Sequence, residues 1–356
     1  MQELPQETSR FIDGRSQALA EAMTARQYAV MPELAARYGE PGRAKCLQDA
    51  LYHLSYLSQS IAAGRPALFA DYVQWAKIML AGRGIPAEDL ATNLACMREA
   101  LEQVLPPPMA ALACGYVEAG EADLPHSAST AASFIADGAP LSDLARAYVS
   151  ALLDGDRQRA SRLILEAVAG GVSVRDVYLQ VFQPSQYEIG RLWQMNTVNV
   201  AQEHYCTAAT QLIMSQLYPY IFTNRKHGWR LVAACVGGDL HEIGVRMVSD
   251  LFEMDGWDTF YLGANMPAAG IIQTLAAQRA DVLAISTTIS TYVKNVTELI
   301  SAVRHASETA RVKILVGGYP FNIAADLWRQ IGADGYAADA ADAVAVANRM
   351  MNKERL

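Results

Sequence analysis

Residues 230–244 read RLVAACVGGDLHEIG, and this segment marks a change in the pattern of the chain. Its apolar run, 231–236, leads directly into Gly-Gly-Asp. Further short apolar runs follow, with helical spacing between them, at 257–262, 282–286 and 312–316. Continuous apolar strands that alternate with helices are typical of a parallel sheet covered by helices on both faces. Residues 227–356 are therefore predicted to form a flavodoxin-like, Rossmann-type doubly wound parallel sheet.

The carboxyl ends of parallel strands meet at one edge of such a sheet, and ligands bind in the crevice beyond that edge. Small or polar residues follow three of the predicted strands. They are Gly237-Gly238-Asp239, Ser286-Thr287-Thr288 and Gly317-Gly318. We therefore expect these three segments to line a ligand crevice.

Apolar residues upstream of the predicted sheet recur at helical spacing. The chain is therefore predicted to be multidomain, α and α/β, with an all-helical domain at 1–125 and a four-helix bundle at 126–226. In the first domain we expect a helix over 43–62 and a linker over 118–125. The last helix of the bundle is expected to run from Val200 to about Phe222.

The composition of the chain limits its function. It has 356 residues, of which 52% are hydrophobic, so it can bury more than one core. Its formal net charge is −8, and because an acidic surface repels phosphates and anionic lipid, we expect no direct contact with nucleic acid or membrane. No apolar run is long enough to span a bilayer and the first residues lack a signal-peptide core, so the protein is expected to be cytoplasmic. The five cysteines show no Cys-x-x-Cys spacing and are expected to be reduced.

The first strand end carries the sequence Asp239-x-His241-x-x-Gly244. An imidazole on a loop at a strand end can project into the ligand crevice. A carboxylate two residues earlier can accept a hydrogen bond from one ring nitrogen, which fixes the tautomer and leaves the other nitrogen for a metal. Gly244 leaves room for a ligand to approach the helix that follows. The alternative for His241 is an ordinary histidine on a surface loop.

This sequence resembles the cobalamin-binding signature of corrinoid enzymes and sensors, and the resemblance extends over 229–356. It implies that His241 ligates the cobalt from below, as the metal ligand. It also implies that the cofactor is contacted by Asp239, Gly244, Ser286, Thr288, Gly317 and Gly318. The main alternative for the sheet is a nicotinamide-binding Rossmann domain. That domain requires Gly-x-Gly-x-x-Gly, whereas an acidic loop follows the glycines here.

A second pattern lies in the predicted bundle, where Trp193 is followed, after nine residues, by Glu203-His204. This pattern resembles the bundle motif of cobalamin-dependent photoreceptors. The resemblance implies that the three side chains enclose the upper face of adenosylcobalamin, and that light-triggered cleavage of the cobalt–carbon bond changes conformation or assembly. Some of these photoreceptors have a histidine at the position of Gln194, so a second histidine ligand after illumination is in doubt. The alternative is that Trp193 is a core residue and Glu203-His204 a solvated helix start.

The N-terminal region contains Phe69-x-x-Tyr72-x-x-Trp75 and a following polar segment. This region resembles photocobilins, which are cobalamin photoreceptors that also bind a linear tetrapyrrole such as biliverdin. A bilin needs an aromatic pocket and basic groups for its propionates. The residues available for such a pocket are Arg43, Tyr52, His53, Tyr56, Arg65, Tyr72 and Trp75. The alternative is that the aromatic residues form plain helix core.

Three functions remain open at this point. The first, which the pattern of Trp193 with Glu203-His204 favours, is a light or cobalamin sensor that signals through its own oligomer or a protein partner. The second is a corrinoid methyl carrier of a methyltransferase system, which fits the Asp239-x-His241 loop equally well. The third is a cobalamin-responsive antirepressor that binds a transcription factor. We find no nucleophile–base pattern for hydrolysis in the sequence and expect a carrier or sensor rather than an enzyme.

Overall fold

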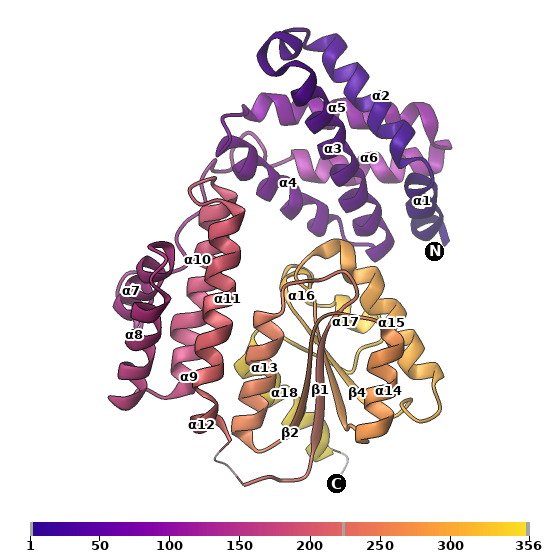
Figure 1. Ribbon diagram of the computed structural model, residues 1–356. Helices are drawn as coiled ribbons and strands as arrows, with labels where there is room; N and C mark the ends of the chain where they lie inside the picture. Colours follow the sequence, from indigo (N-terminus) through magenta and orange to yellow (C-terminus); the bar gives the residue numbers. More distant parts are fainter. Residues whose placement is uncertain (1–2, 223–224, 354–356) are drawn as a thin grey trace. The chain divides into compact units, whose positions relative to one another are not determined.

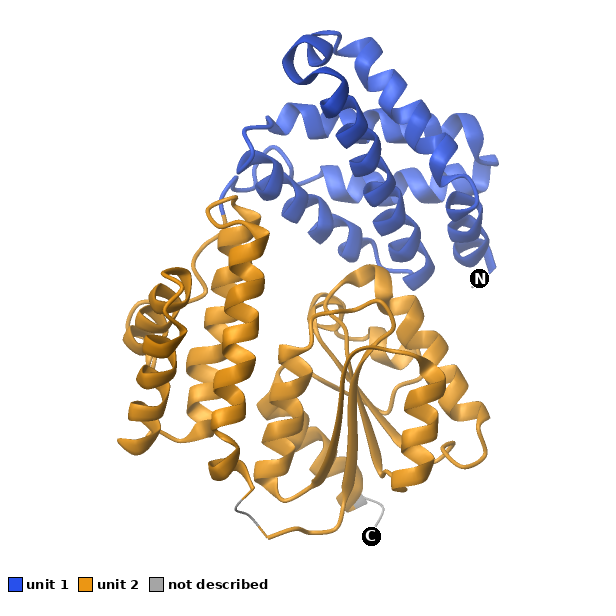
Figure 2. Cartoon of the chain, in the orientation of Figure 1, with its two compact units in different colours: residues 1–130 blue, residues 131–356 orange. Residues whose placement is uncertain are grey.

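The computed structural model describes residues 3–222 and 225–353, and the chain forms two compact units, residues 1–130 and 131–356 (Figure 2). Unit 1 is helical, which confirms the all-helical prediction for this region. Its helices are α1 (Glu3–Asp13), α2 (Ser16–Val30), α3 (Glu33–Ala63), α4 (Pro66–Ala81), α5 (Ala87–Val104) and α6 (Pro107–Glu121).

Two sequence predictions for unit 1 were inaccurate. The helix expected over 43–62 begins slightly earlier, just after Gly39, where non-helical backbone with φ at 60° and ψ at −165° separates it from the first turns of α3. The segment expected to be a linker is helical as far as Glu121. Its polar residues form the outer face of α6, where Arg98 pairs with Glu118 at 3.6 Å and with Glu121 at 3.2 Å.

The first half of unit 2 is a bundle in which four long helices pack against one another (Figure 1). They are α7 (Ser142–Leu153), α8 (Arg157–Ala169), α10 (Gln183–Gln194) and α11 (Val200–Gln216). A short α9 (Val174–Val177) and a π-helical turn (Tyr178–Phe182) lead into α10. The last helix ends earlier than expected. A separate turn, α12 (Tyr218–Ile221), follows it, because Pro219 has no N–H with which to continue the ladder.

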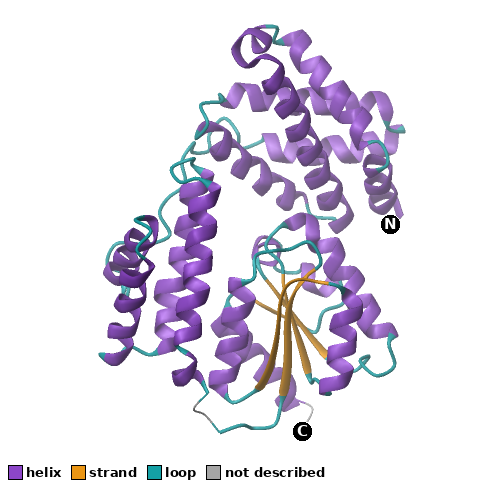
Figure 3. Cartoon of the chain, in the orientation of Figure 1, coloured by secondary structure: helices purple, strands orange, loops and turns teal. Residues whose placement is uncertain are grey.

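The second half of unit 2 is a five-stranded parallel sheet in the order β2-β1-β3-β4-β5 (Figure 3). This is the flavodoxin-like order, so the predicted fold class is confirmed. The strands are β1 (Arg230–Val236), β2 (Asp258–Met266), β3 (Val282–Ser286), β4 (Lys313–Gly317) and β5 (Gly335–Ala337). The division of the chain into three domains, with boundaries after 125 and 226, stays a prediction.

Helices cover both faces of the sheet (Figure 1). One face carries α13 (Ile243–Asp255) and α18 (Ala340–Lys353), and the other carries α14 (Ala268–Gln278) and α15 (Val293–His305). Short helical turns, η2 (Ser290–Tyr292), α16 (Tyr319–Ile323) and α17 (Leu327–Gln330), complete the loops. No helix in the described ranges is both long and apolar enough to cross a membrane.

Candidate functional site

The loop that carries His241 lies where the strand order of the sheet reverses, between β1 and β3. Ligands of doubly wound sheets bind at this switch point. Asp239 joins the two strand ends: its Oδ2 accepts hydrogen bonds from the Thr287 hydroxyl at 3.0 Å and from the Thr288 N–H at 2.6 Å. The carboxylate is fully buried, and these bonds hold it in a fixed position.

The second oxygen of Asp239 holds the histidine. Its Oδ1 accepts hydrogen bonds from the backbone N–H of His241 at 3.0 Å and from the ring Nδ1 at 2.8 Å. The imidazole is 55% exposed, whereas the carboxylate behind it is buried. Since Nδ1 is engaged, Nε2 is the ring nitrogen that can bind a metal.

Electrostatics reinforce this pair. The hydrogen bond that His241 donates to Asp239 raises the pKa of His241, and the carboxylate of Glu203 adds to the shift. Burial by itself would raise the pKa of Asp239, but its hydrogen bonds from His241 and Thr288 outweigh burial and lower this pKa. Asp239 therefore stays ionised, and an ionised carboxylate behind an imidazole increases its basicity as a ligand.

The end of β2 secures the other side of the loop. Asn265, with φ at 51°, accepts a hydrogen bond on its side-chain oxygen from the Gly238 N–H at 2.7 Å. Its own N–H donates to the carbonyl of Asp239 at 2.9 Å. The predicted strand ended before this point, but β2 continues to Met266 through register shifts against β1. The loop is thus held from β2 and from β3.

The predicted glycines differ in their surroundings. Gly318 has φ at 104°, and a Cβ there would lie 2.0 Å from the carbonyl oxygen of Thr287. A Cβ on Gly317 would be 3.1 Å from the carbonyl oxygen of Ala337, whereas one on Gly244 would meet no heavy atom within 4 Å. The backbone at Gly318 therefore requires glycine for packing, Gly317 is only tight, and the start of α13 is open for a ligand.

The bundle residues of the second pattern lie on two helices. Trp193 is a partly buried residue near the end of α10. Glu203 lies in the first turn of α11, where its carboxylate contacts His204 Nδ1 at 2.9 Å and accepts a hydrogen bond from the Thr207 hydroxyl at 3.0 Å. His204 is 74% exposed. The carboxylate of Glu203 is also one of the charges that raise the pKa of His241.

The structure brings together the aromatic residues expected in unit 1. Tyr72 stacks on Tyr56 with ring centroids 3.7 Å apart, its hydroxyl is 2.8 Å from Nδ1 of buried His53, and the ring of Trp75 lies 6.3 Å away. Burial lowers the pKa of His53 to about 4, so this histidine is neutral in the folded protein. Tyr52 is exposed. The two arginines contact other groups: Arg43 lies over the ring of Tyr28, and Arg65 donates to the carbonyl of Gly64.

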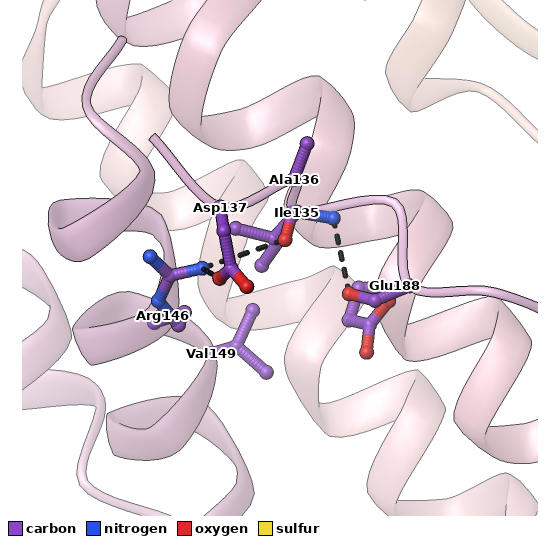
Figure 4. A pocket seen from close by; sticks show the side chains of 7 residues that line it. Ile135, Ala136, Asp137, Arg146, Val149 and Glu188 are labelled. Carbon is purple, nitrogen blue, oxygen red and sulfur yellow. Dashed lines mark hydrogen bonds and ion pairs between the residues drawn. The ribbon is translucent and has the colours of Figure 1, made fainter. Parts of the chain in front are cut away.

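A cavity of about 460 Å³ lies at the edge of the bundle (Figure 4). Its charged residues already have partners within the chain. Arg146 pairs with Asp137 and Asp143, each at 3.1 Å, and Glu188 pairs with Arg191 at 2.6 Å. None of the predicted site residues lines this cavity.

Several residues that support the site escaped the sequence predictions. Thr287, rather than its neighbours, sends its side chain to Asp239. Asn265 follows the predicted second strand, and its two hydrogen bonds to the loop were not expected. Glu242, which follows His241, contacts both β2 and α11. Thr287 and Asn265 could have been found from the sequence, because both are polar residues near the end of a strand. No local pattern in the sequence indicates the partners of Glu242.

Comparison with known families identifies which proteins the two halves of unit 2 resemble. Residues 229–345 match the B12 binding domain, and residues 144–218 match a second family model of the same description. The chain is a cobalamin-binding protein. Residues 6–122 match a different family, the phycobilisome proteins.

Relatives of this cobalamin-binding protein are named corrinoid proteins. It is 26% identical over 208 residues to a corrinoid protein of Desulfitobacterium hafniense, across 57% of this chain and 95% of that protein. It is 32% identical over 122 residues to dimethylamine corrinoid protein 3 of Methanosarcina acetivorans, but the match spans only 56% of that relative and 34% of this chain. The solved monomethylamine corrinoid protein of Methanosarcina barkeri has a similar fold. Its TM-score is 0.53 at 22% identity, and the match covers 60% of this chain and all of that one.

Proposed function

We propose that this chain is a corrinoid carrier that holds cobalamin at the switch point between β1 and β3 and presents a methyl group to a methyltransferase partner. The observation that carries the cofactor assignment is the hydrogen-bonded path from His241 through Asp239 to Thr287 and Thr288. The names of the corrinoid relatives support the carrier role.

The residues of the site fit a cobalt corrinoid. The bond to Asp239 commits Nδ1 of His241, so Nε2 would hold the cobalt of a bound corrinoid. Open space at Gly244 accommodates the cofactor beside the loop. Bound cobalamin supplies a reactive cobalt–carbon bond. The chain orients the imidazole through Asp239 and keeps it basic, and the loops at Ser286, Thr288, Gly317 and Gly318 would contact the bound cofactor.

His241→Ala tests the cofactor assignment. We expect the wild-type chain with hydroxocobalamin to show the absorption spectrum of histidine-ligated cobalt. The variant should lose that spectrum and release the cofactor faster. His305→Ala is the matched control, because His305 is an exposed histidine at the end of α15, bonded to the carbonyl of Ser301. An unchanged spectrum in His241→Ala overturns the assignment of the lower ligand.

A second candidate function is a light sensor that binds adenosylcobalamin, and two observations favour it. The match of residues 6–122 to phycobilisome proteins supports a tetrapyrrole such as biliverdin in unit 1, at the aromatic cluster around Tyr72. The positions of Glu203 and His204 at the start of α11 suit a site that encloses the upper ligand. In this interpretation, light-triggered cleavage of the cobalt–carbon bond changes the conformation or the assembly of the chain.

The choice of upper ligand separates the two candidates. A carrier must leave the upper face accessible, so it should bind methylcobalamin at least as tightly as adenosylcobalamin. A sensor should prefer adenosylcobalamin, and its dark spectrum should change under green light. A far-red absorption band on addition of biliverdin supports the bilin site, and the absence of such a band counts against it. If the chain binds methylcobalamin more strongly and shows no response to light, the result supports the carrier function and excludes the sensor function.

A further inference from the structure

Glu242, the residue after His241, joins three elements of unit 2. Its Oε1 accepts a hydrogen bond from Gln211 Nε2 of α11 at 2.6 Å. Its Oε2 accepts hydrogen bonds from the Tyr261 hydroxyl at 2.9 Å and from the Ala264 N–H at 3.2 Å, both on β2. The residue therefore connects the His241 loop to the sheet edge on one side and to the bundle on the other.

The backbone of β2 is shaped for this contact. The register between β1 and β2 shifts between Ala233 and Ala234 and again before Val236. Such bulges re-aim groups of a strand. Gly263 lies in the shifted part with φ at 81°, and a Cβ there would stand 3.1 Å from Glu242 Oε2. Contacts with β2 therefore fix the position of the Glu242 carboxylate.

The bundle side of the contact is equally ordered. Gln211 lies on the same face of α11 as His204, two turns along the helix. On α13, one turn after Glu242, Arg246 donates to the carbonyl of Gln211 at 3.1 Å and to the Ser215 hydroxyl at 2.7 Å. The helix that carries Glu203 and His204 is therefore attached to the element that begins beside His241.

We propose that Glu242 is a positioning residue: its hydrogen bond with Gln211 sets how far Glu203 and His204 stand from His241. The inference rests on the proposed role of His241 as the lower ligand, since this spacing then defines the space above the cobalt. Because Gln211 approaches the carboxylate with its amide N–H, the contact depends on one donor and one acceptor and can be inverted.

The test exchanges donor and acceptor. Gln211→Glu places two carboxylates against each other and should separate α11 from α13. In the double variant Gln211→Glu/Glu242→Gln, the new amide nitrogen at 242 donates to the new carboxylate. Its amide oxygen still accepts from Tyr261 and Ala264. Every donor and acceptor around residues 211 and 242 then has a partner, so the double variant should restore the wild-type contact. Gln216→Glu is the matched control, because Gln216 is an exposed residue of α11 whose side chain bonds only within the bundle, to Ser161 at 2.5 Å.

The measurement is hydrogen–deuterium exchange of the α11 amides in the full chain without cofactor, followed by the rate at which hydroxocobalamin is released. We expect Gln211→Glu to accelerate both by roughly tenfold, the double variant to return within about twofold of wild type, and Gln216→Glu to have no effect. The proposal is overturned if Gln211→Glu behaves like the control, or if the double variant stays as fast as the single one. The amide exchange without cofactor tests the role of Glu242 alone. If the wild-type chain fails to show histidine-ligated cobalt, that result counts against the proposed function and leaves the exchange result valid.

Discussion

Asp239 is the residue on which the geometry of the site depends. Its two oxygens accept from the backbone and ring of His241 and from Thr287 and Thr288, so every neighbour in these bonds is a donor. Asp239→Asn would place an amide N–H against one of these donors. A buried polar group that loses its partner costs about 1–3 kcal/mol of folding free energy.

We therefore expect Asp239→Asn to lower the free energy of unfolding by that amount. We also expect it to weaken hydroxocobalamin binding about 10- to 100-fold, as is typical when the partner of a metal-ligating histidine is removed. Urea unfolding and an absorbance titration measure the two effects. Full affinity in Asp239→Asn would show that the carboxylate does not support a metal ligand.

The residue scale also shows where prediction from sequence ends. The spacing of Asp239 and His241 was sufficient to expect their hydrogen bond, because the two residues are neighbours on one loop. No partner for Asp239 after β3 was predicted. Ser286 is the last residue of that strand, and beyond a strand end the alternation of side chains no longer decides which one faces the site. Thr287 faces Asp239, and Thr288 contacts it through its backbone.

Two glycine substitutions separate packing from ligand binding. Gly318→Ala forces a Cβ against Thr287 at a positive φ, so we expect it to destabilise the chain without cofactor by about 2 kcal/mol or more. Gly244→Ala adds a Cβ in open space within α13, so stability should stay level or rise by up to about 1 kcal/mol. The dissociation constant of the Gly244→Ala variant for hydroxocobalamin should nevertheless increase. Unchanged binding by Gly244→Ala would remove this residue from the cofactor site.

At the scale of elements, the π-helical turn before α10 links the bundle to the sheet. The hydroxyl of Tyr178 in this turn donates to Asp250 of α13 at 2.8 Å. Burial raises the pKa of Asp250 to about 6 from its ordinary value of 3.8. In the pH window between 3.8 and about 6, the folded protein keeps a proton on Asp250 that the unfolded chain has released. The contribution of Asp250 to the free energy of unfolding is therefore largest below the window, falls as pH rises through it, and is level above it.

Asp250→Asn removes this titration and keeps an acceptor for Tyr178. We expect the stability of wild type, measured relative to the variant, to fall by about 2–3 kcal/mol as pH rises through the window. Urea unfolding of both proteins at a series of pH values gives the difference directly. A difference that does not change with pH would mean that Asp250 titrates alike in the folded and unfolded chain.

Elements were predicted well where local pattern and packing agree. β1 and β3 have the expected bounds, because continuous apolar runs mark strands buried on both faces. β2 was predicted too short, since the apolar run ends at Leu262, whereas Ala264 and Asn265 stay in the strand through their bonds to the loop after β1. The contact of Glu242 with α11 joins residues 31 positions apart, and no periodicity in the sequence indicates it.

At the scale of the whole molecule, the two units have separate hydrophobic cores. One core consists of residues between Ile12 and Leu124, and the other of residues between Ile135 and Met351. The predicted cobalamin site lies wholly in unit 2, and the aromatic cluster around Tyr72 lies wholly in unit 1. A ligand stabilises only the cooperative unit that binds it, by about 2.7 kcal/mol when its concentration is 100 times the dissociation constant.

We therefore expect calorimetry to resolve two unfolding transitions that respond to different ligands. Hydroxocobalamin should raise the midpoint of the unit 2 transition and leave that of unit 1 in place, because only unit 2 contains His241. His241→Ala should reduce this shift without moving the unit 1 transition. Biliverdin, if it binds at Tyr72, should raise only the unit 1 transition, and Tyr72→Leu should abolish that response. Equal shifts of both transitions with hydroxocobalamin would contradict the expectation, because they would mean that the two cores unfold as one cooperative body.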